Sequence, residues 1–137
     1  MRVAEWEESK YLVLSSFVFF IPCVYAYTQQ LYVHSAFTAL CTVASINFWR
    51  DAEYGYRRNL DVACARVGLA WGLYECTKTS IPIPYLSEIA LSIGGSYALS
   101  KLHYRRNQPQ WLYYHIAFHI ITSIHCVCGL YVIKRYK

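Results

Sequence analysis

The residues best suited to chemistry lie in the last hydrophobic stretch of the chain, residues 111–133. His115 and His119 stand four residues apart, so a helix places both imidazoles on one face, about one turn apart. Two histidines at this spacing are a common pair of metal ligands. A carboxylate such as Asp61 could add a third ligand, orient a ligand, or act as a general base. The alternative is that both histidines hydrogen-bond to neighbouring helices or line a wet groove.

The same stretch is about as long as a bilayer is thick, which limits where its polar residues can point. His115, His119, Thr122 and Cys126 follow one another in steps of four, three and four, so they share a narrow helical stripe. A polar stripe on a helix of this length is expected to face protein or water rather than acyl chains.

The composition predicts insertion into a membrane. The chain has 137 residues, of which 56% are hydrophobic and only 15% charged, whereas soluble domains carry roughly 25% charged residues. We therefore predict an all-α, polytopic membrane helix bundle that forms a single domain over residues 1–137, with about five transmembrane helices. The predicted spans are residues 11–27, 31–49, 60–79, 85–100 and 111–133. A four-span alternative makes the third or fourth segment re-entrant.

The net charge of +5 is spread over short basic clusters between the hydrophobic segments. Such clusters are typical of membrane orientation and contact with lipid headgroups, and they form no continuous face for nucleic acid. More Lys and Arg fall on the side of the N-terminus, so the positive-inside rule predicts a cytoplasmic N-terminus. The six cysteines lie mostly inside apolar segments and form no CxxC pair, which predicts free thiols.

Several residues inside the predicted spans indicate how the helices pack. Pro22 is expected to kink the first span, with a neighbouring helix satisfying the freed carbonyl. Arg66 lies near the middle of the third span, where we expect it to pair with an acid or reach a watery cleft. Gly68 and Gly72 could let another helix approach closely, as could a row of serines spaced by four. That row is Ser92, Ser96 and Ser100.

Alternating spans bring some polar residues to the same depth. Ser45 ends the second span, Asp61 begins the third, and His115 begins the fifth on the same side, with His119 one turn deeper. We therefore predict that these four residues converge in one polar pocket.

These positions resemble the CREST superfamily, which comprises seven-helix membrane hydrolases and receptors such as alkaline ceramidases and the progestin and adipoQ receptors. The resemblance is a sparse pattern: Ser45, the pair Leu60-Asp61 opening the next helix, and His115-x-x-x-His119 in the last helix. It implies a zinc ion held by His115 and His119, water activated with the help of Asp61, and a contribution of Ser45 to the oxyanion environment.

The chain departs from that family pattern at two points. Trp49 stands four residues after Ser45, where the early histidine ligand falls, and the chain has about five spans rather than seven. Because catalytic zinc normally has three protein ligands, Asp61 or another group is needed as the third.

Three classes of function follow from these features. The resemblance implies a metal-dependent hydrolase of a lipid amide or ester, or a degenerate, non-catalytic relative. The first alternative is a non-catalytic membrane protein that assembles with itself or with a membrane partner through small-residue faces. The second is a small transporter or proton path that uses the histidines and three charged residues as intramembrane relays. Those charged residues are Asp61, Arg66 and Glu75.

Overall fold

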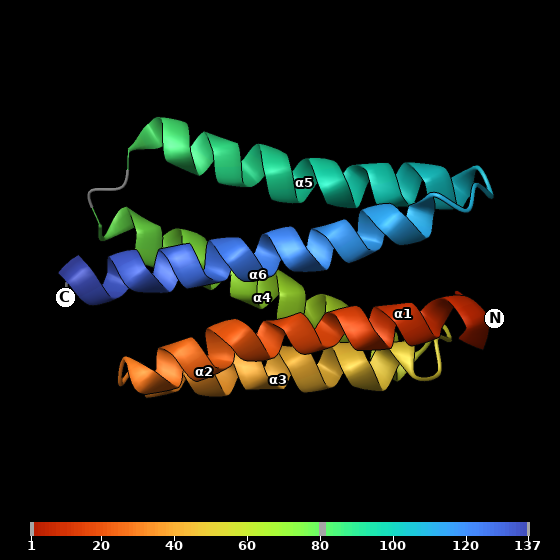
Figure 1. Cartoon of the computed structure of the whole chain (residues 1–137), viewed down its shortest axis with the longest axis horizontal. Helices are drawn as coiled ribbons and strands as arrows, with labels where there is room; N and C mark the ends of the chain where they lie inside the picture. Colours follow the sequence, from red (N-terminus) through yellow and green to blue (C-terminus); the bar gives the residue numbers. More distant parts are fainter. Residues whose placement is uncertain (1, 80–81, 137) are drawn as a thin grey trace.

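A computed structural model describes residues 2–79 and 82–136, and helices make up nearly all of the described chain (Figure 1). The elements are α1 (Trp6–Ser16), a 3-10 helix η1 (Phe17–Phe19), α2 (Phe20–Thr28), α3 (Tyr32–Trp49), α4 (Tyr56–Thr77), α5 (Ile83–Arg105) and α6 (Trp111–Tyr136). Beside the helices, a single isolated bridge joins Arg2 to Glu53, and no strand occurs among the described residues. The all-α prediction is confirmed.

The last helix, α6, lies at the centre of the arrangement. α1, η1 and α2 form one nearly continuous rod beside α3, and α6 runs between this rod and α5 (Figure 1). Among the described helices, α5 packs against α6 alone, whereas α6 also contacts α1, α2 and α4. The predicted functional helix is therefore the one that most of the chain surrounds.

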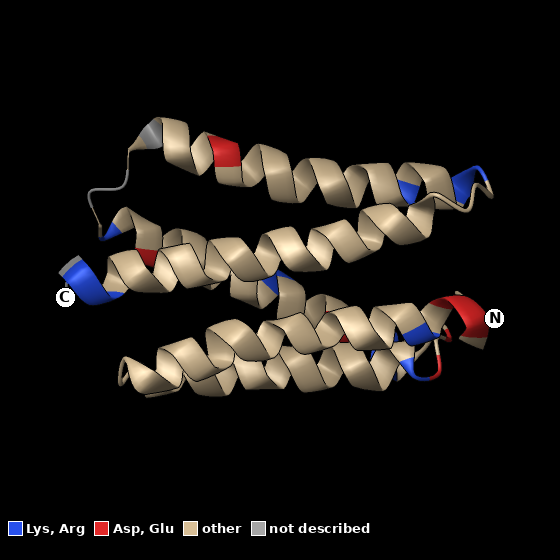
Figure 2. Ribbon diagram, viewed as in Figure 1, with Lys and Arg blue, Asp and Glu red and all other residues tan. Residues whose placement is uncertain are grey.

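Two parts of the described chain are long and apolar enough to cross a membrane, Trp6–Thr28 and Trp111–Arg135. The first combines α1, η1 and α2, and the second is α6. The other three predicted spans fall on α3, α4 and α5, which are not among these two, so five spans remain a prediction. Figure 2 shows that most charged residues gather at the two ends of the bundle, with a largely uncharged band between them.

Pro22 leaves a carbonyl of the first rod without its helical donor, and a neighbouring helix satisfies it as predicted. A proline has no amide hydrogen, so the carbonyl of Val18, four residues earlier, loses its helical donor. The helix tightens into η1 over Phe17–Phe19, and the hydroxyl of Ser123 on α6 donates a hydrogen bond to the Val18 carbonyl at 2.9 Å. A neighbouring helix thus satisfies the group that proline leaves unpaired.

The small-residue faces pack against other helices of the same chain, although close approach does not occur at every predicted position. The row of serines on α5 faces α6, because Ser92 and Ser100 hydrogen-bond to histidines of that helix. On α4, a Cβ added at Gly68 would lie 3.1 Å from the ring of Phe37, whereas Gly72 has nothing within 4 Å of that position. Close approach therefore occurs at Gly68 alone of the two glycines.

One of the two environments expected for Arg66, an ion pair with an acid, is not observed among the described residues. Arg66 is exposed on α4, and the described part of the chain places no carboxylate in an ion pair with it.

An apolar core closes the end of the bundle at which the chain begins. It is formed by Ala4, Leu12, Phe48, Trp49, Ala52 and Trp111. The N-terminal segment is tied to this core by two hydrogen bonds, from the Val3 amide to the Ala52 carbonyl at 2.6 Å and from the Tyr104 hydroxyl to the Val3 carbonyl at 3.0 Å. The candidate site lies next to this core.

Candidate functional site

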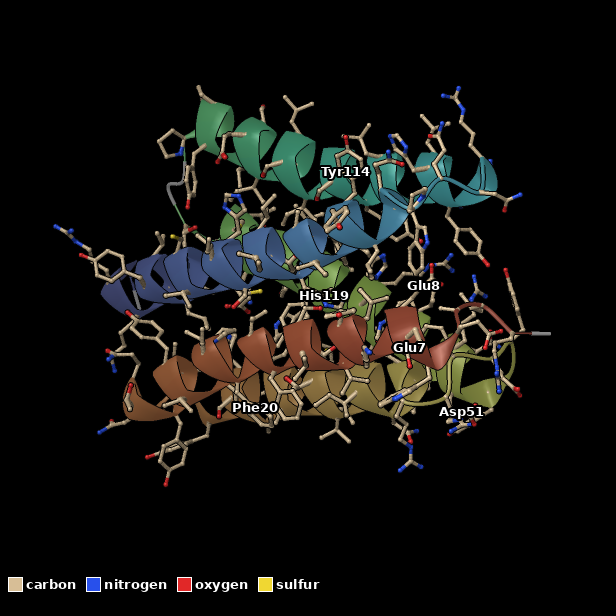
Figure 3. All side chains as sticks on the ribbon, turned by 45° about the vertical axis from the view of Figure 1, so that its right-hand side comes forward. Glu7, Glu8, Phe20, Asp51, Tyr114 and His119 are labelled. Carbon is tan, nitrogen blue, oxygen red and sulfur yellow. The ribbon has the colours of Figure 1, made fainter. Side chains whose placement is uncertain are left out.

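The two histidines predicted as metal ligands lie next to each other inside the bundle. His119 is only 3% exposed, and His115 is partly buried one turn before it. Their ring centroids are 5.0 Å apart, with the planes at 74°. Figure 3 shows His119 on the side of α6 that faces the rod formed by α1 and α2.

Each imidazole is held by a serine of a different helix. Nδ1 of His119 lies 2.8 Å from the hydroxyl of Ser15 on α1. Nδ1 of His115 lies 3.1 Å from the hydroxyl of Ser100 on α5. Three helices therefore meet at the histidine pair.

The serine hydroxyls couple the position of each imidazole to its tautomer. Ser15 lies 3.2 Å from the Leu12 carbonyl oxygen, and Ser100 lies 3.2 Å from the Trp111 carbonyl oxygen. A hydroxyl has one proton, so each serine either donates to its carbonyl and accepts from the histidine, or donates to the ring nitrogen.

The contacts of the two histidines with Ser15 and Ser100 form one arm of a polar network. Ser45 and Asp61 belong to its second arm. The hydroxyl of Ser45 on α3 lies 3.0 Å from that of Ser16 on α1, and the Asp61 side chain on α4 lies beside Ser45. Ser16 donates to the Leu12 carbonyl at 2.7 Å. The two arms, through Ser15 and Ser16, therefore end on one carbonyl oxygen.

Asp61 is the titratable end of this second arm. Ser16 and Ser45 have one hydroxyl proton each, and either can be the donor in the contact between them, so the hydroxyls can adapt to both protonation states of Asp61. Burial in an apolar bundle favours the neutral carboxyl, whereas a hydrogen bond donated by Ser45 favours the carboxylate.

The four predicted site residues are thus linked in one region, but through two residues that the sequence prediction did not name. Ser15 and Ser16 join His119 to Ser45, and all five long rods of the bundle contribute to the network. The pair of adjacent serines inside an otherwise apolar first span is the pattern that could have indicated them.

The donor set does not fit a catalytic zinc ion. Among the described residues, no group of three His, Cys, Asp or Glu side chains lies close enough to hold a metal, whereas catalytic zinc takes three protein ligands. Trp49 stands where the resemblance implies an early histidine; it is 4% exposed, and its ring centroid lies 5.0 Å from that of His115. Its indole nitrogen is buried and hydrogen-bonds to none of the described residues.

A second polar group lies toward the opposite end of α6. Nε2 of His125 is 2.9 Å from the hydroxyl of Ser92 and 3.7 Å from a carboxylate oxygen of Glu88, both on α5. Cys126, which the helical stripe was expected to turn toward protein or water, is exposed on the outside of α6. The buried face of this helix therefore turns from His119 toward Ser123 and His125 rather than toward Cys126.

Comparisons of the chain with models of protein families, with curated protein sequences and with solved structures find no match in any of the three. The function proposed below therefore rests on the geometry of this chain.

Proposed function

We propose that the chain is a multi-pass integral membrane protein that conducts protons through its buried Asp–Ser–His network. The membrane placement is supported by apolar side chains that point outward along several helices, such as Ile21, Leu91 and Ile124 at 61%, 76% and 56% exposure. An apolar surface of this extent is unfavourable in water and favourable in lipid. Charged residues gather beyond it, at the ends of the bundle (Figure 2).

The line of titratable groups and hydroxyls carries the proposal of conduction. Asp61 can release and take up a proton beside Ser45, and the hydroxyl of Ser45 contacts that of Ser16. On the other arm, Nδ1 of His119 contacts Ser15 and Nδ1 of His115 contacts Ser100, and each imidazole has a second nitrogen through which a proton can leave. Titratable groups beside hydroxyls in an apolar interior are the parts of an intramembrane relay.

In this scheme the serines move protons by turning their hydroxyls. Ser45 accepts the Asp61 proton while passing its own to Ser16, and Ser16 turns from the Leu12 carbonyl to pass its own to the neighbouring Ser15. Ser15 passes its own proton to Nδ1 of His119 in the tautomer that carries a proton on Nε2, and the imidazole then releases the Nε2 proton. Asp61 lies at the sixth residue of α4, near the end of the bundle where it can exchange protons with water, and His119 lies deeper on α6. Asp61 is thus the loading group and His119 the internal acceptor.

The path continues along α6 beyond His119. Thr122 Oγ1 and His125 Nδ1 are buried without a hydrogen-bond partner among the described residues. Buried polar atoms of this kind are normally satisfied by ordered water, which can also carry a proton. His125 is followed by Glu88, whose side chain is 56% exposed, so this acid is the exit group.

Asp61→Asn is the sharpest test, because the asparagine amide can still donate to Ser45 but has no proton to release. The protein is reconstituted in liposomes that contain a pH-sensitive dye, and proton entry is driven by a potassium gradient with valinomycin. We expect proton entry above that of protein-free liposomes for the wild type, loss of this flux in Asp61→Asn, and a nearly unchanged unfolding temperature. Asp51→Asn, in the loop before α4, is the matched control and keeps the flux. Wild-type flux equal to that of empty liposomes, or full flux in Asp61→Asn, would overturn the proposal.

A further inference from the structure

An open cavity lies away from the Asp–Ser–His network, on the outside of the bundle. It has a volume of about 520 Å³ and is bordered by α2, the first turn of α5 and the last third of α6. Its lining residues are Tyr25, Tyr85, Val127, Cys128, Tyr131 and Val132. The volume is in the range of pockets that hold small ligands, and the walls are apolar or aromatic.

Two cations stand at the end of this cavity. The guanidinium of Arg135 donates a hydrogen bond to the hydroxyl of Tyr131 at 3.4 Å, which places the cation at the rim formed by that tyrosine. Lys134 is its neighbour in the last turn of α6, and both residues are exposed. Figure 2 shows this basic turn at the C-terminal tip of the helix.

Neither cation is neutralised by a carboxylate of the described residues, since no ion pair within 4 Å involves Lys134 or Arg135. The acid on the adjoining part of α5 is Glu88, which lies beside His125. His125 precedes Arg135 by ten residues, or roughly 15 Å along the helix axis. The rim of the cavity is therefore positive at Tyr131, Glu88 lies toward its Tyr85 side, and its interior is apolar.

We propose that this cavity, here named the tyrosine cavity, binds an anionic phospholipid of the surrounding bilayer. An acyl chain packs against the tyrosine rings and the two valines, and the phosphate lies beside Arg135 and Lys134. Such a pairing of an apolar groove with a basic rim at a helix end is how membrane proteins select anionic headgroups. The inference rests on the membrane placement proposed above and is independent of proton conduction.

Native mass spectrometry tests the proposal on the full chain. The protein is reconstituted in liposomes of equal parts phosphatidylglycerol and phosphatidylcholine, extracted in mild detergent, and the retained lipids are counted. We expect the wild type to retain phosphatidylglycerol preferentially. The double variant Lys134→Gln/Arg135→Gln should lower the ratio of anionic to zwitterionic lipid by about fivefold for each charge removed.

Cys128→Trp, which fills the cavity and leaves both cations in place, should reduce the number of retained lipids of both kinds. The matched control is Arg105→Gln/Arg106→Gln, which removes two charges at the other end of the bundle and should leave the ratio unchanged. Equal retention of both lipids by the wild type, or an equal loss in the control, would overturn the proposal. Retention of a second protein chain that only Cys128→Trp abolishes would overturn it in favour of a dimer contact.

Alkaline carbonate extraction of the liposomes separates this inference from the proposed function. If carbonate removes the protein, the membrane placement is wrong and both proposals fail. If the protein stays inserted and conducts protons but shows no lipid preference, the lipid site alone is wrong.

Discussion

The hydroxyl of Ser15 lies 2.8 Å from Nδ1 of His119, and this contact joins the first and the last helix in the interior of the bundle. Both residues are less than 9% exposed, so neither can replace the bond with one to bulk water. Because the Leu12 carbonyl is a second acceptor for the one proton of Ser15, the contact couples the tautomer of His119 to its position. A structural role and a chemical role thus depend on one hydroxyl.

Ser15→Ala should therefore destabilise the protein and disturb His119 at the same time. Nδ1 of His119 is left buried without its serine partner, and an unsatisfied buried polar group typically costs about 1–3 kcal/mol. Thermal unfolding in detergent, followed by circular dichroism, measures the loss. Thr28→Ala is the control, because Thr28 is exposed and bonds only to a carbonyl of its own helix. An equal effect of both substitutions would mean that the contact with His119 contributes nothing.

Trp49→His should create a metal site where the wild type lacks one. The Trp49 ring lies 5.0 Å from that of His115, and the His115 ring is 5.0 Å from that of His119. A histidine at position 49 could thus complete a set of three imidazoles, the number that catalytic zinc normally takes from protein. We expect substoichiometric zinc in the purified wild type and about one zinc per chain in the variant, measured by mass spectrometry of the metal.

Adding His119→Ala to Trp49→His should abolish the gained zinc. The substitution of a buried tryptophan also opens a cavity and should cost several kcal/mol, on the order of 3–5. Bound zinc should recover part of this loss, because a ligand that binds only the folded state stabilises it. Stoichiometric zinc in the wild type would contradict the donor set described for the site.

The helices of this fold could be predicted from the sequence more completely than the contacts between its polar side chains. Hydrophobic length and the helical spacing of serines are local properties, so the helices and the packing face of α5 could be predicted. The link between Ser45 and the histidines could not, because it passes through Ser16 and Ser15 of a helix far away in sequence. The rotation of α6, which exposes Cys126 and buries Ser123, is likewise set by its neighbours rather than by its own pattern.

Gly68→Ala and Gly72→Ala should have opposite consequences, although both lie on α4. A Cβ at position 68 would meet the Phe37 ring at 3.1 Å, so that α3 and α4 must shift or the ring must turn. Position 72 has open space, and alanine there should stabilise the helix by up to about 1 kcal/mol. Chemical unfolding in detergent compares the two free energies. A gain of equal size at both positions would show that α3 does not approach α4 at Gly68.

Tyr104 should make the stability of the N-terminal end fall at alkaline pH. Burial raises the pKa of Tyr104 above its ordinary value of 10, and the nearby Tyr54 raises it further. The folded chain therefore keeps the phenolic proton at a pH where the unfolded chain has lost it. The stabilising contribution is complete below pH 10 and decreases as the pH rises above it, by at most about 1.4 kcal/mol per pH unit.

Tyr104→Phe removes this alkaline dependence together with the hydrogen bond to the Val3 carbonyl. At neutral pH the variant should be less stable by roughly 0.5–1.5 kcal/mol, the usual net contribution of one such bond. Between pH 10 and 11 the difference from the wild type should shrink, because the wild type alone loses the contribution of Tyr104. Tyr56→Phe, at a side chain 80% exposed, is the control for the loss of a hydroxyl. A difference between Tyr104→Phe and the wild type that stays constant over this pH range would show that the Tyr104 phenol is solvated in the folded protein.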